Sequence, residues 1–490
     1  MDANLVQVAL QNVNFAAIMP SLVLSCFGMA LLLISVFSKR GATAHISLLS
    51  LVAIVITGVV CVGGWNPPTP IEGFYGAVVL DNYATFFNII FLTAAALTIL
   101  ISDGYLQREG YPIGEYYPLI LFCTAGAMWM ASGTDMMTIF LGLEVLSIAL
   151  YALAGLFRNQ TGSNEAGLKY FLLGAFSTGF LLYGMALVYG VTGSTQITEI
   201  ATFLGENTAN YQNPMMIAGM LLLGTGFLFK IAAAPFHMWT PDVYQGAPTP
   251  VTAFMSVAPK AAAFAALVRI FVISMEGMTA DWTALLWVLA VLTMIAGNFV
   301  ALKQTNLKRM LAYSSIAHAG YALVGLVAAN AVGISGILFY MLAYTFMNIG
   351  AFAILVLAGK KGEENLTLEG FSGFGFKRPF LGVAMTICLL SLMGIPPTAG
   401  FAGKFYIFAG AVKAGYVWLA VLGVLNSAVS LYYYLRVMVY MYFRDPVEDF
   451  GWVQSNASTM VSIVLALAGI LILGVIPGTF MDLARMANIL

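Results

Sequence analysis

The sequence predicts an all-α, polytopic membrane protein with about 14 transmembrane helices. Of its 490 residues, 61% are hydrophobic and only 8% are charged, whereas about a quarter of the residues in a soluble domain carry charge. The chain also has room for well over ten apolar spans of about 20 residues each. The net charge of −1 carries no sign of a nucleic-acid partner. The partner that this composition indicates is the lipid bilayer.

Fourteen apolar windows account for most of the chain. They fall near residues 15–37, 45–64, 81–102, 115–132, 134–157, 166–191, 214–235, 251–274, 282–303, 308–329, 331–359, 379–412, 414–443 and 457–478. The segment before the first window, MDANLVQVALQN, is acidic and no small-residue cleavage pattern follows it. We therefore expect the first window to be a retained helix and not a signal peptide.

Basic residues are distributed unequally over the connections. Most of them lie in the odd-numbered joins: Lys39, Arg40, Arg108, Arg158, Lys169, Lys303, Lys308, Arg309, Lys360, Lys361, Lys377, Arg378, Arg436 and Arg444. Even-numbered joins such as GGWNPPTPIEGFYG and SMEGMTADW contain no lysine or arginine. Cytoplasmic connections are the ones enriched in these residues. The pattern predicts cytoplasmic odd joins and both termini on the outer side.

Lys230, Lys260, Lys404 and Arg269 do not follow this pattern, because they lie within apolar windows. A lysine at the centre of a bilayer costs roughly 2.5–3.5 kcal/mol. Arg269 is close to the outer end of its window, so its side chain is expected to extend to the interface. The three lysines lie too deep for that and need partners, a neutral form or water.

Two windows are interrupted near these lysines. In the seventh, Lys230 precedes Pro235; in the twelfth, the GIPPTAG segment precedes Lys404. Proline removes a backbone donor, and non-helical backbone at membrane depth survives only where it is buried or lines a wet cavity. The alternative is that these prolines only shape helix packing. We expect discontinuous helices 7 and 12 beside internal cavities.

The two interruptions are five spans apart, which predicts two five-helix repeats. Because five is odd, the second repeat enters the membrane from the opposite side, as in the inverted repeats of transporters. The predicted organisation has three N-terminal helices, a first repeat, a second inverted repeat, and a final helix with its tail. These parts span residues 1–114, 115–274, 275–443 and 444–490.

Glu144 is the acidic candidate for a functional role. It lies near the middle of the fifth span, in TIFLGLEVLSIALYAL, with no compensating charge in that window. Intramembrane carboxylates commonly mark ion paths. Lys169 opens the sixth span and is a candidate partner across the neighbouring helix. The alternative is a purely structural ion pair.

Two histidines add a secondary proton path. His237 follows the first interruption in APFHMW and is a candidate for passing protons between the cytoplasm and Lys230, or else an interface anchor beside Trp239. His318 lies midway along the tenth span in SSIAHAGY. Because histidine titrates near neutral pH, His318 is a candidate link between Lys260 and Lys404. The alternative for His318 is a neutral packing role.

Other conspicuous residues are interpreted as structural. The four cysteines lie in or beside apolar windows without CxxC spacing, so we predict no metal site: Cys26, Cys61, Cys123 and Cys388. The run Tyr432, Tyr433 and Tyr434 is typical of an interfacial aromatic belt.

Several segments resemble one family of respiratory proteins. LEVLSIALYAL, NEAGLKYFLLGAFSTGFLLYG, FKIAAAPFHMWTPDVYQGAPTPVTAFMSVAPKAAAF, LKRMLAYSSIAHAGY and GIPPTAGFAGKFYIF are similar to the N subunits of bacterial NADH:quinone oxidoreductase, respiratory complex I. The resemblance extends to mitochondrial subunit 2 and to Mrp-type antiporter subunits. It covers nearly the whole chain and is most specific over residues 141–436. Lys404 matches the N pattern, where related M subunits carry a glutamate.

The resemblance implies a role as a proton-translocating subunit of an NADH:quinone oxidoreductase. Glu144 and Lys230 would form the proton-uptake pair, Lys260 the central relay and Lys404 the exit. The chain itself shows no GxGxxG after a strand, no Walker sequence and no CxxC cluster. We therefore expect no cofactor in this chain. The resemblance implies that NADH, FMN, Fe–S clusters and quinone bind in partner subunits. The expected partners are antiporter-like M and small K- and J-type subunits in the bacterial inner membrane, with the hydrophilic redox arm acting indirectly.

Other functions stay open at this stage. One is an Mrp-type cation/proton antiporter subunit, although Na⁺ transport favours more intramembrane carboxylates than Glu144 alone. Others are the related subunit of a membrane-bound hydrogenase or of a plastid-type NDH complex. A scaffold that has lost pumping is a further alternative, against which the retained Glu144, Lys230, Lys260 and Lys404 argue.

Overall fold

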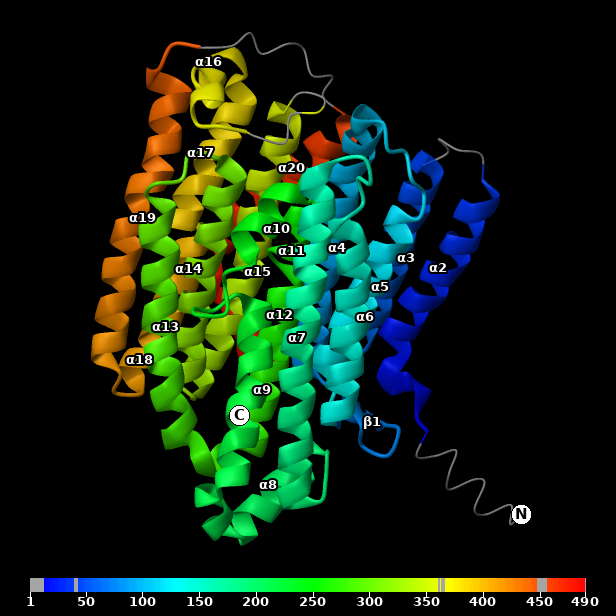
Figure 1. Cartoon of the computed structure of the whole chain (residues 1–490), viewed down its shortest axis with the longest axis vertical. Coiled ribbons are helices and arrows are strands. Elements are labelled where there is room, and N and C mark those ends of the chain that lie inside the picture. Colours follow the sequence, from blue (N-terminus) through cyan, green and yellow to red (C-terminus); the bar gives the residue numbers. More distant parts are fainter. Residues whose placement is uncertain (1–12, 39–42, 360–361, 363–365, 447–455, 490) are drawn as a thin grey trace.

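The computed structural model describes residues 13–38, 43–359, 362, 366–446 and 456–489. Long helices run nearly parallel through the molecule, and α13 and α19 lie at the opposite edge from α2 and α3 (Figure 1). Of the predicted cytoplasmic residues, Lys39, Arg40, Lys360 and Lys361 lie outside the described part.

The N-terminal part contains three long helices and a small hairpin. Its elements are η1 (Phe15–Ile18), α2 (Met19–Phe37), α3 (Thr43–Gly63), β1 (Ile71–Gly73), β2 (Val78–Leu80) and α4 (Asn82–Glu109). Asp81 caps α4 by accepting a hydrogen bond from the amide of Ala84 at 2.7 Å. Gly110 ends α4 in the left-handed region, with φ of 82°.

The hairpin is a local departure from the all-helical prediction. β1 and β2 pair antiparallel with Ile71 opposite Leu80, in the segment expected to be an irregular connection. Phe74, Tyr75 and Gly76 take positive φ values between the two strands. Pro67, Pro68 and Pro70 exclude a helix just before β1, and the chain then reverses direction at residues 74–76.

The middle of the chain forms the first set of spanning helices. Its elements are α5 (Tyr116–Ser132), α6 (Met136–Ala154), α7 (Thr161–Thr192), α8 (Ile197–Glu206), η2 (Thr208–Gln212), α9 (Pro214–Ile231), α10 (Thr240–Gly246), α11 (Thr249–Met255), α12 (Ala258–Leu267) and the π-helical η3 (Val268–Ser274).

The remainder forms the second set. Its elements are η4 (Glu276–Met278), α13 (Thr279–Ala301), α14 (Leu307–Val327), α15 (Ala331–Ala358), η5 (Glu369–Phe371), α16 (Phe374–Lys377), α17 (Pro379–Met393), α18 (Ala399–Lys413), α19 (Val417–Phe443), α20 (Ala457–Val475) and α21 (Pro477–Met486).

The spans agree with the prediction from hydropathy. In the described part of the chain, 12 helices are long and apolar enough to cross a membrane. The other two predicted windows correspond to α5, with 17 residues, and to α17 and α18, with 15 residues each. An all-α, polytopic membrane protein is therefore confirmed.

Both predicted interruptions are present. α9 ends at Ile231, directly after Lys230, and Ala232 takes φ of 61°. α17 ends at Met393, and α18 begins at Ala399. Three prolines account for the interruptions, because Pro235, Pro396 and Pro397 provide no backbone donor.

A third interruption lies in the eighth window, which the sequence predicts to be one continuous helix. α11 ends at Met255 and α12 begins at Ala258. Pro259 occupies the first turn of α12, where its missing N–H costs no helical hydrogen bond. The break therefore lies immediately before Lys260.

The centre of the molecule is formed by α14, α15 and the segment from α11 to η3. Their spanning windows are 89–94% buried, whereas those of α2, α3 and α20 are 33% buried. Helices that are apolar on all sides and enclosed by other helices form the core of a membrane bundle. The lysine-bearing breaks border this core.

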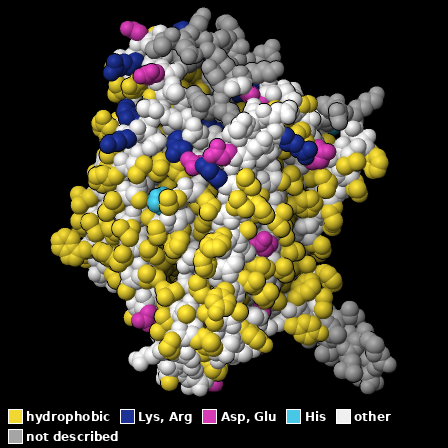
Figure 2. All heavy atoms as spheres, viewed as in Figure 1, with side chains coloured by type: hydrophobic (Ala, Val, Ile, Leu, Met, Phe, Trp, Pro, Cys, Tyr) yellow, Lys and Arg dark blue, Asp and Glu magenta, His cyan; other side chains and the backbone are white. Residues whose placement is uncertain are grey.

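Charge and hydrophobicity are separated on the surface. Figure 2 shows lysine and arginine side chains gathered toward the end where α16 lies, and a broad hydrophobic face between the two ends. Such a belt suits a bilayer with basic residues on one side.

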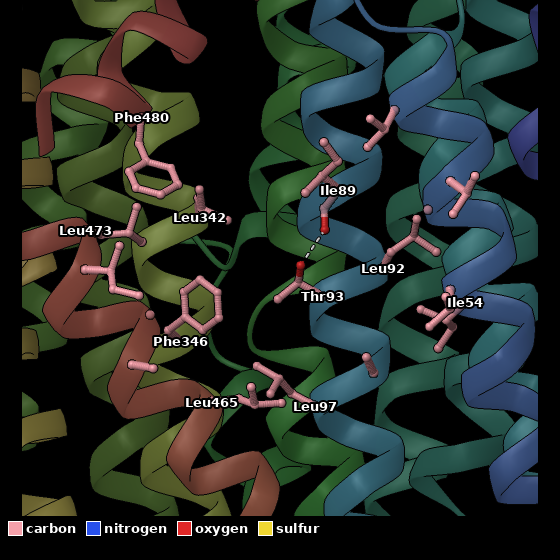
Figure 3. A pocket seen from close by; sticks show the side chains of 18 residues that line it. Ile54, Ile89, Leu92, Thr93, Leu97, Leu342, Phe346, Leu465, Leu473 and Phe480 are labelled. Atoms are coloured by element: carbon pink, nitrogen blue, oxygen red, sulfur yellow. Dashed lines mark hydrogen bonds between the residues drawn. The ribbon is translucent and has the colours of Figure 1, made fainter. Parts of the chain in front are cut away.

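An apolar groove opens between α3 and α4 on one side and α15, α20 and α21 on the other (Figure 3). Its volume is about 830 Å³, and its lining includes Ile54, Leu92, Leu342 and Phe346. The hydroxyl of Thr93, which lines the groove, donates to the carbonyl of Ile89 within its own helix. The groove thus presents an apolar surface at membrane depth.

Candidate functional site

Lys230 lies in the last turn of α9 and is 3% exposed. Its ammonium donates to the Ser147 hydroxyl of α6 at 2.7 Å. The ammonium also lies over the rings of Tyr151, at 5.7 Å, and Tyr170, at 5.3 Å. These contacts provide cation–π attraction and one neutral acceptor inside the bundle. The position beside a helix C-terminus also favours a positive charge.

Glu144 lies on α6, three residues before Ser147, and is half-buried. Its carboxylate accepts a hydrogen bond from the Thr178 hydroxyl of α7 at 3.0 Å. Within the described residues, no ion pair joins Glu144 to Lys230, although Glu144 and Ser147, the acceptor of Lys230, lie one turn apart on α6. The structure thus brings the two predicted residues to one site without joining them.

The predicted pairing of Lys169 with Glu144 is wrong. Lys169 instead forms ion pairs with Glu165, at 2.5 Å, and Asp242, at 2.9 Å. Arg309 of α14 binds the other oxygen of Asp242 at 2.7 Å. On α7, Lys169 lies nine residues before Thr178, the residue that binds Glu144, so the Lys169 side chain reaches the short helix α10 and not the mid-membrane carboxylate.

Asp242 connects three helices, since it lies on α10 and binds residues of α7 and α14. α10 lies between two spanning segments and outside both. Partial burial raises the pKa of Asp242, but hydrogen bonds from Lys169 and Arg309 outweigh burial and lower this pKa below 3.8. The carboxylate is therefore charged at neutral pH.

Lys260 lies in the first turn of α12 and is 2% exposed. Its ammonium donates to the backbone carbonyl of Ser315 on α14 at 2.9 Å. The N-terminal end of a helix is the positive end of its dipole, which disfavours a cation there. Lys260 thus has one neutral acceptor and an opposing helix dipole.

His318 lies one turn beyond Ser315 on α14 and is 2% exposed. Its Nδ1 is 2.5 Å from the Tyr340 hydroxyl of α15, and its Nε2 is 3.1 Å from the Tyr434 hydroxyl of α19. The Tyr434 hydroxyl also forms a hydrogen bond with the Ser314 hydroxyl. His318 therefore belongs to a buried network of hydroxyl groups.

Lys404 lies on α18 and is 4% exposed. It donates to the carbonyls of Leu392, at 3.0 Å, and Met393, at 2.9 Å, and to the Ser427 hydroxyl of α19 at 2.8 Å. Leu392 and Met393 are the last residues of α17, whose final carbonyls have no helical partner. The break in this span thus creates the binding site of its lysine.

Glu144, Lys230, Lys260 and Lys404 together are called the row, and α14 connects its last two members. Lys260 binds Ser315, and Lys404 lies 4.6 Å from the ring centre of Tyr321. His318 is midway between these two residues on α14. At 1.5 Å per residue, Ser315 and Tyr321 are about 9 Å apart along the helix axis. His318 therefore lies between the two lysines, as the link predicted from the sequence requires.

His237 lies in the connection from α9 to α10 and is partly buried. Its Nδ1 has no hydrogen-bond partner among the described residues. No described hydrogen bond joins it to Lys230. A role of His237 in proton uptake therefore stays a prediction.

Arg269 reaches the ends of two neighbouring spans, because Asp81 caps α4 and Ala131 is in the last turn of α5, but it is buried there and not exposed. It is 2% exposed and binds Asp81 at 2.8 Å, the Ala131 carbonyl at 2.7 Å, and the face of the Tyr83 ring at 4.8 Å. A carboxylate 188 residues earlier in the chain satisfies the guanidinium inside the bundle. Arg269, in the π-helical segment η3, therefore has a structural role, because it holds the start of α4 through Asp81.

Two tyrosines of the site were assigned to the interface by the sequence analysis, and this is wrong for both. Tyr433 and Tyr434 are fully buried, whereas Tyr432 is 61% exposed. Ser427, Ser430 and Tyr434 follow one another at helical spacing in an otherwise apolar span. This polar stripe is a signal that identifies an inward-facing side of α19.

Comparisons with known proteins agree with this geometry. The family model described as "NADH:quinone oxidoreductase/Mrp antiporter, TM" matches residues 133–430. NADH-quinone oxidoreductase subunit N of Trichlorobacter lovleyi is 59% identical over 487 residues, covering 99% of each chain. Subunit N 2 of Roseiflexus castenholzii is 41% identical, covering 99% of this chain and 98% of that protein.

Solved structures give the same result. A chain of respiratory complex I from Thermus thermophilus with bound aureothin has a TM-score of 0.81 and 36% identity, covering 95% of this chain and 99% of that one. A chain of the Mrp complex from Dietzia sp. shares the fold, with a TM-score of 0.78, 21% identity, and coverage of 96% and 97%. The chain therefore belongs to the NADH:quinone oxidoreductase/Mrp antiporter family of transmembrane proteins and, within it, is similar to the N subunits of NADH-quinone oxidoreductase.

Proposed function

We propose that this chain is the antiporter-like, proton-translocating N subunit of an NADH:quinone oxidoreductase. Similarity to subunit N over nearly the whole chain supports the assignment. The observation that carries the mechanism is the row of three buried lysines, each beside a helix break and each bound to neutral acceptors. Protons would enter through Glu144 and Lys230, pass Lys260 and leave through Lys404.

The charge environment alternates along this row. The ammonium of Lys230 lies near the C-terminal end of its own helix, α9, and that of Lys404 lies at the C-terminal end of α17, which favours the ammonium form by about 0.3–1 kcal/mol. Lys260 lies at a helix N-terminus, which disfavours it by a similar amount. The outer two lysines are therefore suited to hold a proton, and Lys260 to transmit one.

Helix packing supports the division into two inverted five-helix repeats, which we propose for residues 115–274 and 275–443. α5 packs on α6 as α13 packs on α14, and α7 packs on α9 as α15 packs on α18. The interrupted spans occupy the same place in each set. The segments 1–114 and 444–490 would then flank this transport unit.

The exposed face formed by α6 and α7 is a candidate contact surface for another membrane subunit. Leu141 and Ile148 are exposed, and half-buried Glu144 lies between them on the same side of α6. Phe171 and Phe176 of α7 are also exposed. A carboxylate facing lipid at this depth would be costly. We propose that an M-, K- or J-type membrane subunit covers this face.

Energy for pumping must come from those partners. Moving one charge against 100 mV costs about 2.3 kcal/mol. We propose that NADH, FMN, Fe–S clusters and quinone bind in partner subunits. The chain would lie in the bacterial inner membrane, with its basic end in the cytoplasm and both termini outside.

The test is proton pumping by the assembled complex carrying Glu144→Gln or Lys230→Ala. In each variant the rate of proton pumping should fall by about tenfold or more, and coupled NADH:quinone turnover should fall with it. The reason is that each substitution removes one proton carrier. NADH oxidation by a water-soluble acceptor should stay unchanged, which controls for the redox arm. Wild-type pumping in both variants would refute the proposed path.

A further inference from the structure

A small cavity lies beside Lys230, and two residues that carry hydroxyl groups line it, Ser177 and Thr178. Of these two, Thr178 is the one whose hydroxyl binds Glu144. Lys230 and Thr178 both line this cavity, together with Leu143, Gly174 and Phe229. Its volume is about 10 Å³ of space for a water centre, which is room for about one molecule. The cavity therefore borders Lys230 directly and Glu144 only through Thr178, so a single water in it would bridge Lys230 and the Thr178 hydroxyl.

Thr178 is placed to complete this bridge. Its hydroxyl donates to the Glu144 carboxylate at 3.0 Å. A hydroxyl has one hydrogen to donate and two lone pairs to accept. With its hydrogen on Glu144, Thr178 keeps its lone pairs for a water in the cavity that it lines.

The surroundings of Lys230 restrict its other contacts. Ser147 accepts from the ammonium and donates its own hydrogen to the Leu143 carbonyl, so the Ser147 hydrogen is directed along α6. Tyr151 and Tyr170 present ring faces, which attract a cation but accept no proton from it. The cavity side is the remaining direction with space for a proton acceptor.

We propose that Thr178 is the residue that connects Glu144 to Lys230, through one water held in this cavity. For uptake, the protonated carboxyl of Glu144 gives its proton to the Thr178 oxygen, whose own hydrogen passes to the water. The water in turn gives a hydrogen to the neutral amine of Lys230. The products are a carboxylate and an ammonium, with Thr178 and water regenerated. This inference rests on the proposed function.

The experiment compares Thr178→Val with Thr178→Ser in the assembled complex. Valine keeps the shape of threonine but has no hydroxyl, whereas serine keeps the hydroxyl. Thr178→Val should slow proton pumping by about tenfold, as expected for loss of one hydrogen bond to a charged group, and should increase the solvent deuterium isotope effect. Thr178→Ser should restore wild-type values for both.

Thr225→Val is the matched control, because the Thr225 hydroxyl is exposed and bonds only to the Leu221 carbonyl of its own helix among its described contacts. It should behave as wild type. Wild-type pumping by Thr178→Val would overturn the inference, and so would equal losses in Thr178→Val and Thr178→Ser. Glu144→Gln, measured in parallel, distinguishes failure of the Thr178 inference from failure of the proposed function. Normal pumping in Glu144→Gln would refute the proposed function itself.

Discussion

The buried lysines have neutral hydrogen-bond acceptors, whereas the buried arginine has a carboxylate. Lys230 donates to the Ser147 hydroxyl, Lys260 to the Ser315 carbonyl, and Lys404 to carbonyls at the end of α17. A neutral amine still donates to a hydroxyl or carbonyl oxygen. Loss of a proton therefore leaves no unpaired carboxylate behind. Arginine stays charged in proteins, so Arg269 bound to Asp81 does not serve as a proton carrier.

Tyr434→Phe tests the residue-level link around His318. The substitution removes the hydroxyl that contacts His318 and Ser314 but keeps the buried ring. Proton pumping should fall several-fold because a buried polar network loses about 1–3 kcal/mol with one partner missing. Pumping in inverted membrane vesicles measures this effect. Tyr432→Phe, at an exposed position, should pump normally; identical pumping by both variants would exclude Tyr434 from the path.

Arg269→Ala tests the structural anchor. The variant leaves the carboxylate of Asp81 without its guanidinium partner and should destabilise the fold by about 3–5 kcal/mol. The thermal unfolding midpoint of the detergent-purified complex and the amount assembled on native gels measure the loss. Arg485→Ala, which removes an exposed pair with Asp482, should change neither. An unchanged midpoint in Arg269→Ala would contradict the anchor role.

At the scale of elements, ion pairs of Asp242 with Lys169 and Arg309 join the short helix α10 to α7 and α14. Because its pKa is lowered in the folded state, its stabilisation is present above the unfolded value of about 4 and is lost as pH falls further. Asp242→Asn should lower the unfolding midpoint at pH 7 and remove this part of the acid dependence below pH of about 4. Parallel pH curves for both proteins would show that Asp242 does not contribute.

The crossing of α5 and α6 depends on two glycines. A Cβ on Gly126 would lie 2.6 Å from the Gly142 carbonyl oxygen, and a Cβ on Gly142 would lie 2.7 Å from that of Gly126. Small residues at such crossings let helix backbones approach closely in membranes.

Gly126→Ala should therefore separate α5 from α6 and reduce assembly, and it should also slow pumping because α6 carries Glu144. Gly179→Ala is the control, since no atom lies within 4 Å of its Cβ position. Native gels and pumping assays compare the two variants. Equal assembly and equal pumping would show that the α5–α6 contact tolerates a methyl group.

For the whole molecule, the sequence predicts the architecture well because a bilayer makes strong local demands. Apolar windows of about 20 residues identify the spans, and proline and glycine identify the breaks beside Lys230 and Lys404. The cost of a buried charge then indicates the functional lysines. Each inference depends on residues within one window.

The remaining features depend on packing between distant segments. The bond between Lys169 and Asp242 joins residues 73 positions apart, and that between His318 and Tyr434 joins residues 116 apart. Nothing in either local window specifies such a partner. The break before Lys260 was missed for a different reason, because a proline in a first helical turn is compatible with either a new helix or a kink.

The central claim is that protons cross this chain through the row from Glu144 to Lys404. The most direct test measures protons pumped per NADH oxidised by the complex in sealed liposomes, with Lys260→Met replacing the middle carrier and Lys413→Met, at an exposed position, as the control. Methionine conserves most of the side-chain volume, so packing around α12 should persist. Fewer protons per NADH in Lys260→Met, with the control at the wild-type ratio, is the predicted result. A wild-type ratio in Lys260→Met, at normal assembly, would contradict the account.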